Sequence, residues 1–160
     1  MTERQKTLQK LDEMNIVYEF KEHPAVYTIE EMDNLGISED VVKNLFLRDA
    51  NGKRHFLVTL SKEKQADLRS IGAKLGSSRL SFASEDRLER YLKLTKGSVT
   101  PLGILNDAAC DVEVVFDKDL TGKQRVGVHP NDNTATVWMS FDALHDIVKR
   151  NGNTIRFIEM

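Results

Sequence analysis

Two apolar runs joined by a short polar turn constrain this chain more than any other feature. Residues 42–48 and 55–60 are rich in large and β-branched apolar side chains, and the turn between them contains Asn51-Gly52. Apolar runs of this length, separated by a turn with an Asn-Gly pair, are typical of a β-hairpin. The sequence therefore predicts two antiparallel strands inside a largely buried sheet.

A polar pair, Lys43-Asn44, interrupts the first of these strands. Burying an ammonium costs free energy unless it has a partner or a ligand. At the edge of an apolar sheet, Lys43 is placed to meet an electron-rich substrate. The competing interpretation is a strand-end lysine whose ammonium lies in solvent.

Patterns on either side of the hairpin extend it into an α/β fold. The first predicted helix is N-terminal and has an apolar stripe of Leu8, Leu11 and Met14. A Thr28-Glu31 capping box begins a second helix at 29–35, and Ser61 caps a third at 61–75. Two more helices are predicted at 84–94 and 141–150. The predicted further strands are 16–20, 79–82, 111–116, 125–129, 134–139 and 155–158. Helices and strands alternate irregularly, which favours a single domain over residues 1–160 with a mixed, largely antiparallel central sheet flanked by helices.

Composition excludes several classes of protein. The chain has 160 residues, 40% apolar and 30% charged, which is ordinary for a soluble globular domain. It contains no run of about 18 apolar residues, and its charged N-terminus is unlike a signal peptide. The single Cys110 cannot form an internal disulfide, so we expect a cytoplasmic protein. No zinc-ligand spacing or Gly-rich phosphate loop is present, so no metal or cofactor is expected.

Charge is distributed unevenly along the chain. The net charge is −2, but residues 1–40 carry 4 basic and 10 acidic side chains, whereas residues 41–80 carry 9 basic and 3 acidic ones. The first quarter therefore has a net charge of −6 and the second a net charge of +6. The basic quarter is either a solvated surface or the footprint of a polyanion.

Four segments combine polar side chains with residues, such as glycine and proline, that interrupt regular secondary structure. They are Lys43-Asn44, the loop 97–101 with its glycine and proline, His129-Pro130, and the small residues 133–136. A glycine lets a ligand approach the backbone closely, and a strand-end histidine can donate or accept a hydrogen bond. Each segment also has a purely structural interpretation, and spacing alone does not decide between the two.

With their flanks, these segments resemble a known family, the freestanding prolyl-tRNA editing deacylases of the YbaK/ProX type, which are related to the editing domain of bacterial prolyl-tRNA synthetase. The resemblance extends over nearly the whole chain. It is strongest in 43–47, 79–84, 97–107, and 129–130 with 133–136, in this order and at this spacing.

The resemblance implies hydrolysis of the ester that joins a wrong amino acid, alanine first, to tRNA(Pro). Such an ester is already activated, so the protein mainly positions the attacking group and stabilises an oxyanion. On this basis Lys43 holds the carbonyl, the ribose or the last phosphate, and Asn44 orients the ester or a water. The loop from Gly97 to Pro101 offers backbone groups, and His129 bounds the pocket. The family is thought to recruit a hydroxyl of the terminal adenosine.

The resemblance also implies further site residues and partners. The expected substrate-binding residues are Phe46, Ser98, Val99, Thr100, Asn133, Thr134 and Ala135, and the expected tRNA-binding residues are Arg48 and Arg79. The expected partners are mischarged tRNA(Pro) and prolyl-tRNA synthetase. A compact pocket would exclude proline by size, whereas a preference for cysteine or serine over alanine stays open. Asn131-Asp132 departs from the more apolar residue expected after His129-Pro130. Cys110 has no base beside it and is expected to be a small buried residue.

Two other functions are compatible with the same residues. One is a non-catalytic module that binds tRNA or a synthetase, which would bind without accelerating ester hydrolysis. The other is an amino-acid-sensing domain whose pocket binds free proline or alanine. Retention of both Lys43 and the Gly97–Pro101 loop favours catalysis.

Overall fold

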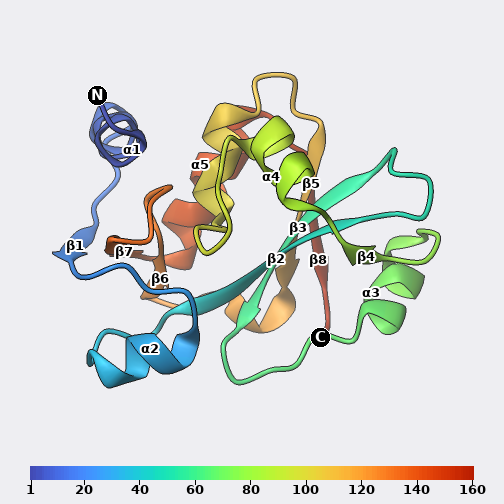
Figure 1. Cartoon of the computed structure of the whole chain (residues 1–160), viewed down its shortest axis with the longest axis horizontal. Helices are drawn as coiled ribbons and strands as arrows, with labels where there is room; N and C mark the ends of the chain where they lie inside the picture. The colour runs from blue at the N-terminus through green and yellow to red at the C-terminus, as the bar shows by residue number, and fades with distance from the viewer.

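The predicted hairpin lies at the centre of a five-stranded sheet. In the computed structural model, which describes residues 1–160, β2 (Val42–Arg48) and β3 (His55–Ser61) are antiparallel and Arg48 is paired with His55. The strand order is β4-β2-β3-β5-β8, where β4 is Ser81–Phe82, β5 is Val112–Asp117 and β8 is Ile155–Ile158. Strands β5 and β8 run parallel to β3, so the sheet is mixed as predicted (Figure 1).

The remaining strands form a second, antiparallel sheet in the order β1-β7-β6. Here β1 is Glu19–Glu22, β6 is Val126–Val128 and β7 is Ala135–Met139. One isolated bridge, between Val41 and Gly127, joins this sheet to the start of β2. Four of the six strand pairings are antiparallel. The mixed, largely antiparallel α/β fold is therefore confirmed, with its strands divided between two sheets.

Alternating side chains of the hairpin build two separate cores. Leu57 faces a cluster that includes Leu88 of α4 (Glu85–Leu92) and Leu144 of α5 (Phe141–Asn151). Phe56 and its neighbours on the other face pack against α3 (Leu68–Leu75). Because successive residues of a strand point to opposite faces, one apolar strand serves both cores. Figure 1 shows α4 and α5 on one side of the sheet and α3 on the other side, near β4.

Two more helices lie outside these layers. α1 (Glu3–Glu13) is capped by Thr2, and Leu11 is its fully buried core residue. α2 (Ile29–Asn34) packs through Met32 on a small cluster that includes Val41 and Trp138. None of the helices combines the length and apolar character that a bilayer-spanning helix needs.

Most predicted element boundaries are confirmed, but one predicted cap is wrong. Thr28, Ser84 and Ser140 cap their helices as expected. Ser61 does not, because α3 begins at Leu68 and is capped by Asp67. Residues 62–67 instead form an irregular connection held by Lys64, whose ammonium binds Asp117 at 2.7 Å.

Three other segments differ from the prediction. The strand expected at 16–20 lies at Glu19–Glu22, and the one expected at 79–82 is reduced to Ser81–Phe82. The segment after the 97–101 loop is a 3₁₀ helix, η1 (Pro101–Asn106), with a second short one, η2 (Lys118–Leu120), after β5.

Candidate functional site

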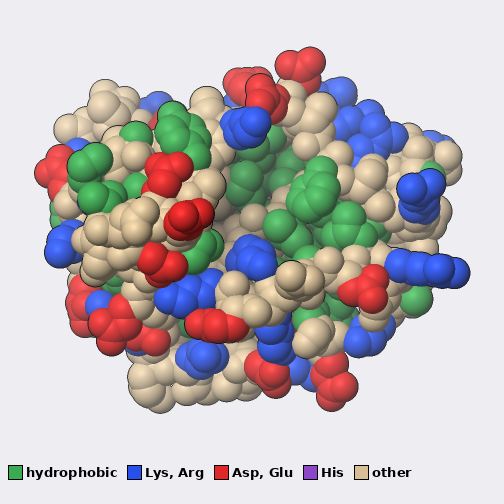
Figure 2. Space-filling view, turned by 60° about the horizontal axis from the view of Figure 1, so that its bottom comes forward, with side chains coloured by type: hydrophobic (Ala, Val, Ile, Leu, Met, Phe, Trp, Pro, Cys, Tyr) green, Lys and Arg blue, Asp and Glu red, His purple; other side chains and the backbone are tan.

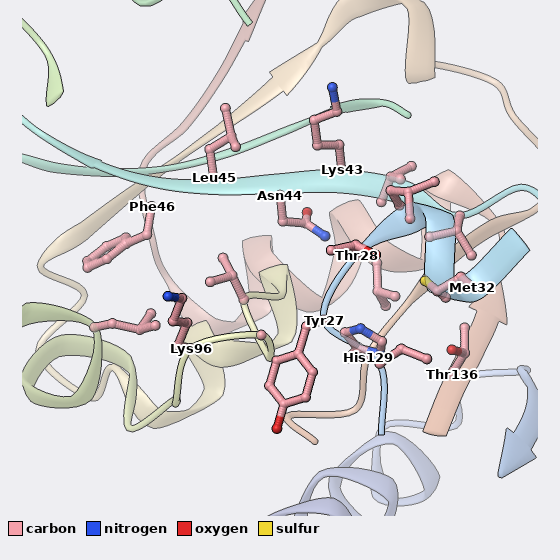
Figure 3. A pocket seen from close by; sticks show the side chains of 18 of the residues that line it. Tyr27, Thr28, Met32, Lys43, Asn44, Leu45, Phe46, Lys96, His129 and Thr136 are labelled. Atoms are coloured by element: carbon pink, nitrogen blue, oxygen red, sulfur yellow. The ribbon is translucent and has the colours of Figure 1, made fainter. Parts of the chain in front are cut away.

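A cavity of about 530 Å³ opens between the two sheets. Its walls come from four stretches that are far apart in the sequence, namely residues 26–32, 41–46, 96–99 and 127–129, with Thr136 and the region around Phe82 completing it. Thirteen of its 22 lining residues are apolar. The volume lies within the usual range for small-molecule sites, and the apolar lining with a few polar groups is typical of them. Figure 2 shows the hollow between apolar side chains, and Figure 3 shows its walls.

Asn44 carries the most precisely oriented polar group of this cavity. It lies opposite Thr59 on β3, and the Thr59 hydroxyl donates a hydrogen bond of 2.7 Å to Asn44 Oδ1. Fixing the oxygen in this way leaves Nδ2 as a donor with no partner inside the protein. Figure 3 shows the Asn44 amide directed into the cavity. The site therefore has one pre-oriented N–H donor facing a mostly apolar space.

Lys43 leaves the same strand in the opposite direction. Its ammonium donates a hydrogen bond to the carbonyl of Lys64, on the side of the sheet covered by α3 (Figure 3). The alternation of side chains along β2 requires this, because Asn44 and Phe46 already face the cavity. Lys43 still lines the wall. The expectation that Lys43 and Asn44 address one substrate together does not fit this arrangement.

Gly97 is needed for contact with a side chain of the protein itself. Its φ is +89°, and a Cβ added there would lie 2.5 Å from Cδ1 of Tyr27. The Tyr27 ring thus occupies the space that we expected a ligand to use, and it is 64% exposed at the cavity mouth (Figure 3). Gly97 lets this ring close one side of the mouth.

His129 is held in a single neutral tautomer. Its Nδ1 lies 2.9 Å from the carbonyl oxygen of Ala135, which only accepts, so Nδ1 carries the proton and Nε2 is left without a partner. Burial lowers the pKa of His129, and the nearby His23 acts in the same direction, whereas the Ala135 carbonyl opposes them. The ring, which lines the cavity, therefore offers a hydrogen-bond acceptor near neutral pH.

Comparison with known proteins places this cavity in a family. The family model for the aminoacyl-tRNA editing domain matches residues 23–147, a stretch that includes every lining residue. The chain belongs to the aminoacyl-tRNA editing domain family. Prolyl-tRNA editing protein ProX of Acetoanaerobium sticklandii is 55% identical over 100% of this chain and 99% of that protein. The resemblance inferred from the sequence is confirmed.

A second relative and a solved structure agree with this assignment. Prolyl-tRNA synthetase associated domain-containing protein 1 of Xenopus laevis is 36% identical, over 94% of this chain and 92% of that protein. The crystal structure of a proposed trans-editing enzyme for prolyl-tRNA synthetase has a TM-score of 0.72, with 18% identity over 100% of this chain and 99% of that chain. At that identity the likeness concerns the fold alone.

Within this editing domain, the Ser98–Pro101 part of the loop supports the wall more than it lines it. Thr100 is fully buried, and its hydroxyl donates a 2.7 Å hydrogen bond to the carbonyl of His129. Pro101 is also buried and starts η1, a position that suits its fixed φ. Ser98 is buried and does not line the cavity, whereas Val99 does. The structure therefore assigns Thr100 and Pro101 to holding the segment that carries His129.

The small residues 133–135 lie behind the cavity as well. Asn133 Nδ2 donates to the Val26 carbonyl at 2.9 Å, and the Val26 N–H donates to the Asn133 carbonyl. Thr134 accepts a hydrogen bond from the His23 N–H through its carbonyl, and Ala135 is buried with its carbonyl on His129. None of these three residues lines the cavity, so their expected contact with substrate stays a prediction. Asn133 and Thr134 hold the segment that precedes Tyr27, and Ala135 holds His129.

The remaining predicted residues are divided between the cavity and the surface. Phe46 lines the cavity and stacks on His55, with ring centroids 5.6 Å apart. Arg48 lies at the far end of β2, where it donates to the carbonyls of Asp49 and Ala50. Arg79 is exposed outside the cavity, and neither arginine lines it.

Sequence reasoning missed several residues of the site. Thr59 could have been found by counting pairs outward from the hairpin turn, because Arg48 opposite His55 puts Asn44 opposite Thr59. Lys96, which precedes Gly97, lies at the cavity mouth with its ammonium 4.0 Å from Glu85 (Figure 3). Thr136 lies in the 133–136 segment that the sequence marked, whereas no local pattern marked Tyr27, Thr28, Met32 or Phe82 as wall residues.

Proposed function

We propose that this protein is a trans-editing hydrolase that deacylates mischarged tRNA(Pro), with Ala-tRNA(Pro) as its first substrate. The observation that carries the proposal is the Asn44 amide, oriented by Thr59 and directed into an apolar cavity. Full-length likeness to a protein named prolyl-tRNA editing protein supports the same activity. The proposed partners are therefore tRNA(Pro) and prolyl-tRNA synthetase.

No protein atom needs to form a covalent bond in this reaction. A water, oriented by the neighbouring ribose hydroxyl of the terminal adenosine, attacks the ester carbonyl carbon and the carbonyl oxygen becomes negative. The C–O bond to the ribose then breaks, the leaving ribose oxygen takes up the proton lost by the water, and the free amino acid is released. Asn44 Nδ2 is the donor proposed for the developing oxyanion, where a pre-oriented donor in a dry site contributes most.

His129 is proposed to position the attacking group. Its unpartnered Nε2 can accept a hydrogen bond from a hydroxyl or from the substrate ammonium, since Nδ1 is committed to Ala135. The lowered pKa favours the neutral ring that this role needs. The Thr100 hydroxyl fixes the backbone of His129, which supports a defined position of the ring.

Two lysines are candidates for the charged parts of the substrate. Lys96 lies at the mouth and is 80% exposed, so its ammonium can reach a phosphate without breaking a strong contact. Lys43 can reach the substrate only if its side chain leaves the Lys64 carbonyl. We therefore propose that Lys96 meets the nucleic acid in the resting arrangement and that Lys43 contacts substrate after it rotates. A comparison of Lys96→Ala with Lys43→Ala separates the two roles.

Selection against proline is proposed to follow from size. Beside Thr136, the cavity has the apolar wall residues Val26, Ile29, Met32, Val41 and Val128. Close-packed apolar walls reject a bulkier ring, but they distinguish weakly between side chains that differ by one hydroxyl or thiol. We propose that alanine is preferred and that serine and cysteine are hydrolysed more slowly.

A deacylation panel tests this function. Purified protein is incubated with tRNA(Pro) charged with alanine, serine, cysteine or proline, and the remaining ester is measured over time. We expect rapid hydrolysis of the ester in Ala-tRNA(Pro), whereas the ester in Pro-tRNA(Pro) should remain intact. Binding of all four without hydrolysis above buffer would instead indicate a non-catalytic tRNA-binding module.

A further inference from the structure

An exposed aromatic side chain stands at the outer edge of the cavity. Phe82 belongs to β4, the edge strand of the five-stranded sheet, and pairs with Leu47 of β2. Its side chain is 62% exposed, although it lines the cavity wall. Large apolar side chains left in water beside a binding cavity are frequently part of an interaction surface.

Phe82 also lines a second hollow, which continues away from the cavity. This hollow has a volume of about 420 Å³ and includes Arg79, Leu80 and Ser81 in its walls. A third hollow shares Arg79 and Leu80 with it and adds Arg69 of α3. The cavity and the two hollows therefore share lining residues in turn, and we call the surface that runs from the cavity over Phe82 to Arg79 and Arg69 the exit path.

The charges along the exit path are unpaired. The guanidinium groups of Arg69 and Arg79 take part in no ion pair and donate no hydrogen bond in the structure, in contrast to Arg54, which binds Glu113 at 3.0 Å. The opposite side of the cavity, around α2, carries Glu30 and Glu31. Figure 2 shows several acidic side chains to the left of the hollow, whereas apolar side chains adjoin it on the right and basic ones lie beyond them. A polyanion that leaves the cavity is therefore drawn toward α3.

We propose that the exit path binds the single-stranded 3′ end of the tRNA, with Phe82 stacking on the base of the nucleotide that precedes the terminal adenosine. Lys96 at the mouth and Arg79 and Arg69 beyond Phe82 neutralise its phosphates. This inference rests on the proposed function, which places the aminoacylated terminus in the cavity. An aromatic platform beside unpaired cations is the usual way in which proteins hold single strands without reading their sequence.

The position of Phe82 explains why this occupant fits better than an acidic peptide. The polymer must continue directly from a group seated in the cavity, and Phe82 lines both the cavity and the hollow beyond it. Phe82 and Arg79 are three positions apart in the sequence, which places their backbones at most about 10 Å apart. A base on the ring and a phosphate on the guanidinium are therefore within reach of the same strand.

Two substrates of different length test the proposal. Hydrolysis of Ala-tRNA(Pro) is compared with hydrolysis of alanyl-adenosine, which fills the cavity but has no preceding nucleotide. The variants are Phe82→Ala, Phe82→Trp, which keeps an aromatic face, and the control Phe20→Ala, which removes a 44% exposed aromatic side chain on β1 outside the cavity. Binding of an uncharged single-stranded RNA ending in CCA is measured alongside by fluorescence anisotropy.

We expect Phe82→Ala to lower kcat/KM for Ala-tRNA(Pro) by about 5- to 100-fold more than it lowers kcat/KM for alanyl-adenosine, because only the tRNA loses one stacked base. Phe82→Trp and Phe20→Ala should behave like the wild type. Arg69→Gln and Arg79→Gln should each reduce the salt dependence of RNA binding by about 0.7 in log–log slope. Equal losses on both substrates, or no loss on the tRNA, would overturn the inference. If the wild type binds the RNA with these dependences but hydrolyses neither ester, the proposed function fails and the binding path stands.

Discussion

The hydrogen bond between Thr59 and Asn44 makes a quantitative prediction about catalysis. Thr59 is fully buried and lies opposite Asn44, so Thr59→Val removes the hydroxyl with almost no change in volume. The Asn44 amide then loses the partner that fixes its orientation. A typical hydrogen bond of this kind contributes about 1 kcal/mol net, which corresponds to roughly a fivefold loss of kcat.

Removal of the donor itself should cost far more. Asn44→Ala deletes the N–H proposed to face the oxyanion, and loss of one such donor lowers kcat by about 10²- to 10³-fold. If Thr59 acts only through Asn44, then Thr59→Val should have no further effect in the Asn44→Ala background. The double-mutant cycle should therefore give a coupling free energy of about 1 kcal/mol.

The assay is single-turnover deacylation of Ala-tRNA(Pro) by the wild type, both single variants and the double variant. Urea unfolding of each variant serves as the control, because Thr59→Val leaves the amide oxygen of the half-buried Asn44 without its protein partner and should lower the free energy of unfolding by about 1 kcal/mol. Rates are compared where all four proteins are folded. Independent, multiplying losses of rate would refute the argument that Thr59 positions Asn44.

Three further predictions concern the walls of the cavity and the stability of the fold. Gly97→Ala should lower the free energy of unfolding by about 1–3 kcal/mol in urea titrations and slow deacylation. The reasons are that a methyl group there would lie 2.5 Å from the Tyr27 ring and that φ is +89°. Wild-type stability in this variant would show that the ring moves freely. Burial lowers the pKa of His129 below that of a histidine in the unfolded chain, so protons bind preferentially to the unfolded state. The free energy of unfolding should therefore fall as the pH drops below about 6.5, as measured by urea unfolding at pH 7.5 and 5.5. Equal stability at both pH values would contradict this. Lys64→Ala should destabilise the protein by about 2 kcal/mol, because it leaves the buried Asp117 carboxylate without its partner at 2.7 Å. Thermal unfolding at neutral pH should show a lower melting temperature, and an unchanged melting temperature would argue against this contact.

Local patterns in the sequence predicted the elements well, and the family was identified by resemblance. The hairpin, the helix caps at Thr28, Ser84 and Ser140, and the mixed sheet all follow from apolar periodicity and from residues that bind free backbone N–H groups. Ser61 has the same local character as these caps. It fails because residues 62–67 are held by Lys64 against Asp117, a contact between distant residues that no local pattern reveals.

The site was predicted less completely for the same reason. Strand alternation already implies that neighbours such as Lys43 and Asn44 point to opposite faces, so assigning both to one substrate conflicted with the predicted strand. The contact of Tyr27 with Gly97 joins residues 70 positions apart, and the glycine alone did not reveal its partner. Sequence therefore located most segments of the cavity but not residues 26–32, and the direction of each side chain required the packed structure.

The central claim is that the Asn44 amide promotes hydrolysis of an aminoacyl ester held in this cavity. The most direct test is the single-turnover rate of Ala-tRNA(Pro) deacylation by the wild type and by Asn44→Ala at saturating protein, with folding of both checked by circular dichroism. We expect rapid hydrolysis by the wild type and a rate lower by about 10²- to 10³-fold in the variant. A folded Asn44→Ala protein that hydrolyses Ala-tRNA(Pro) at the wild-type rate would contradict it.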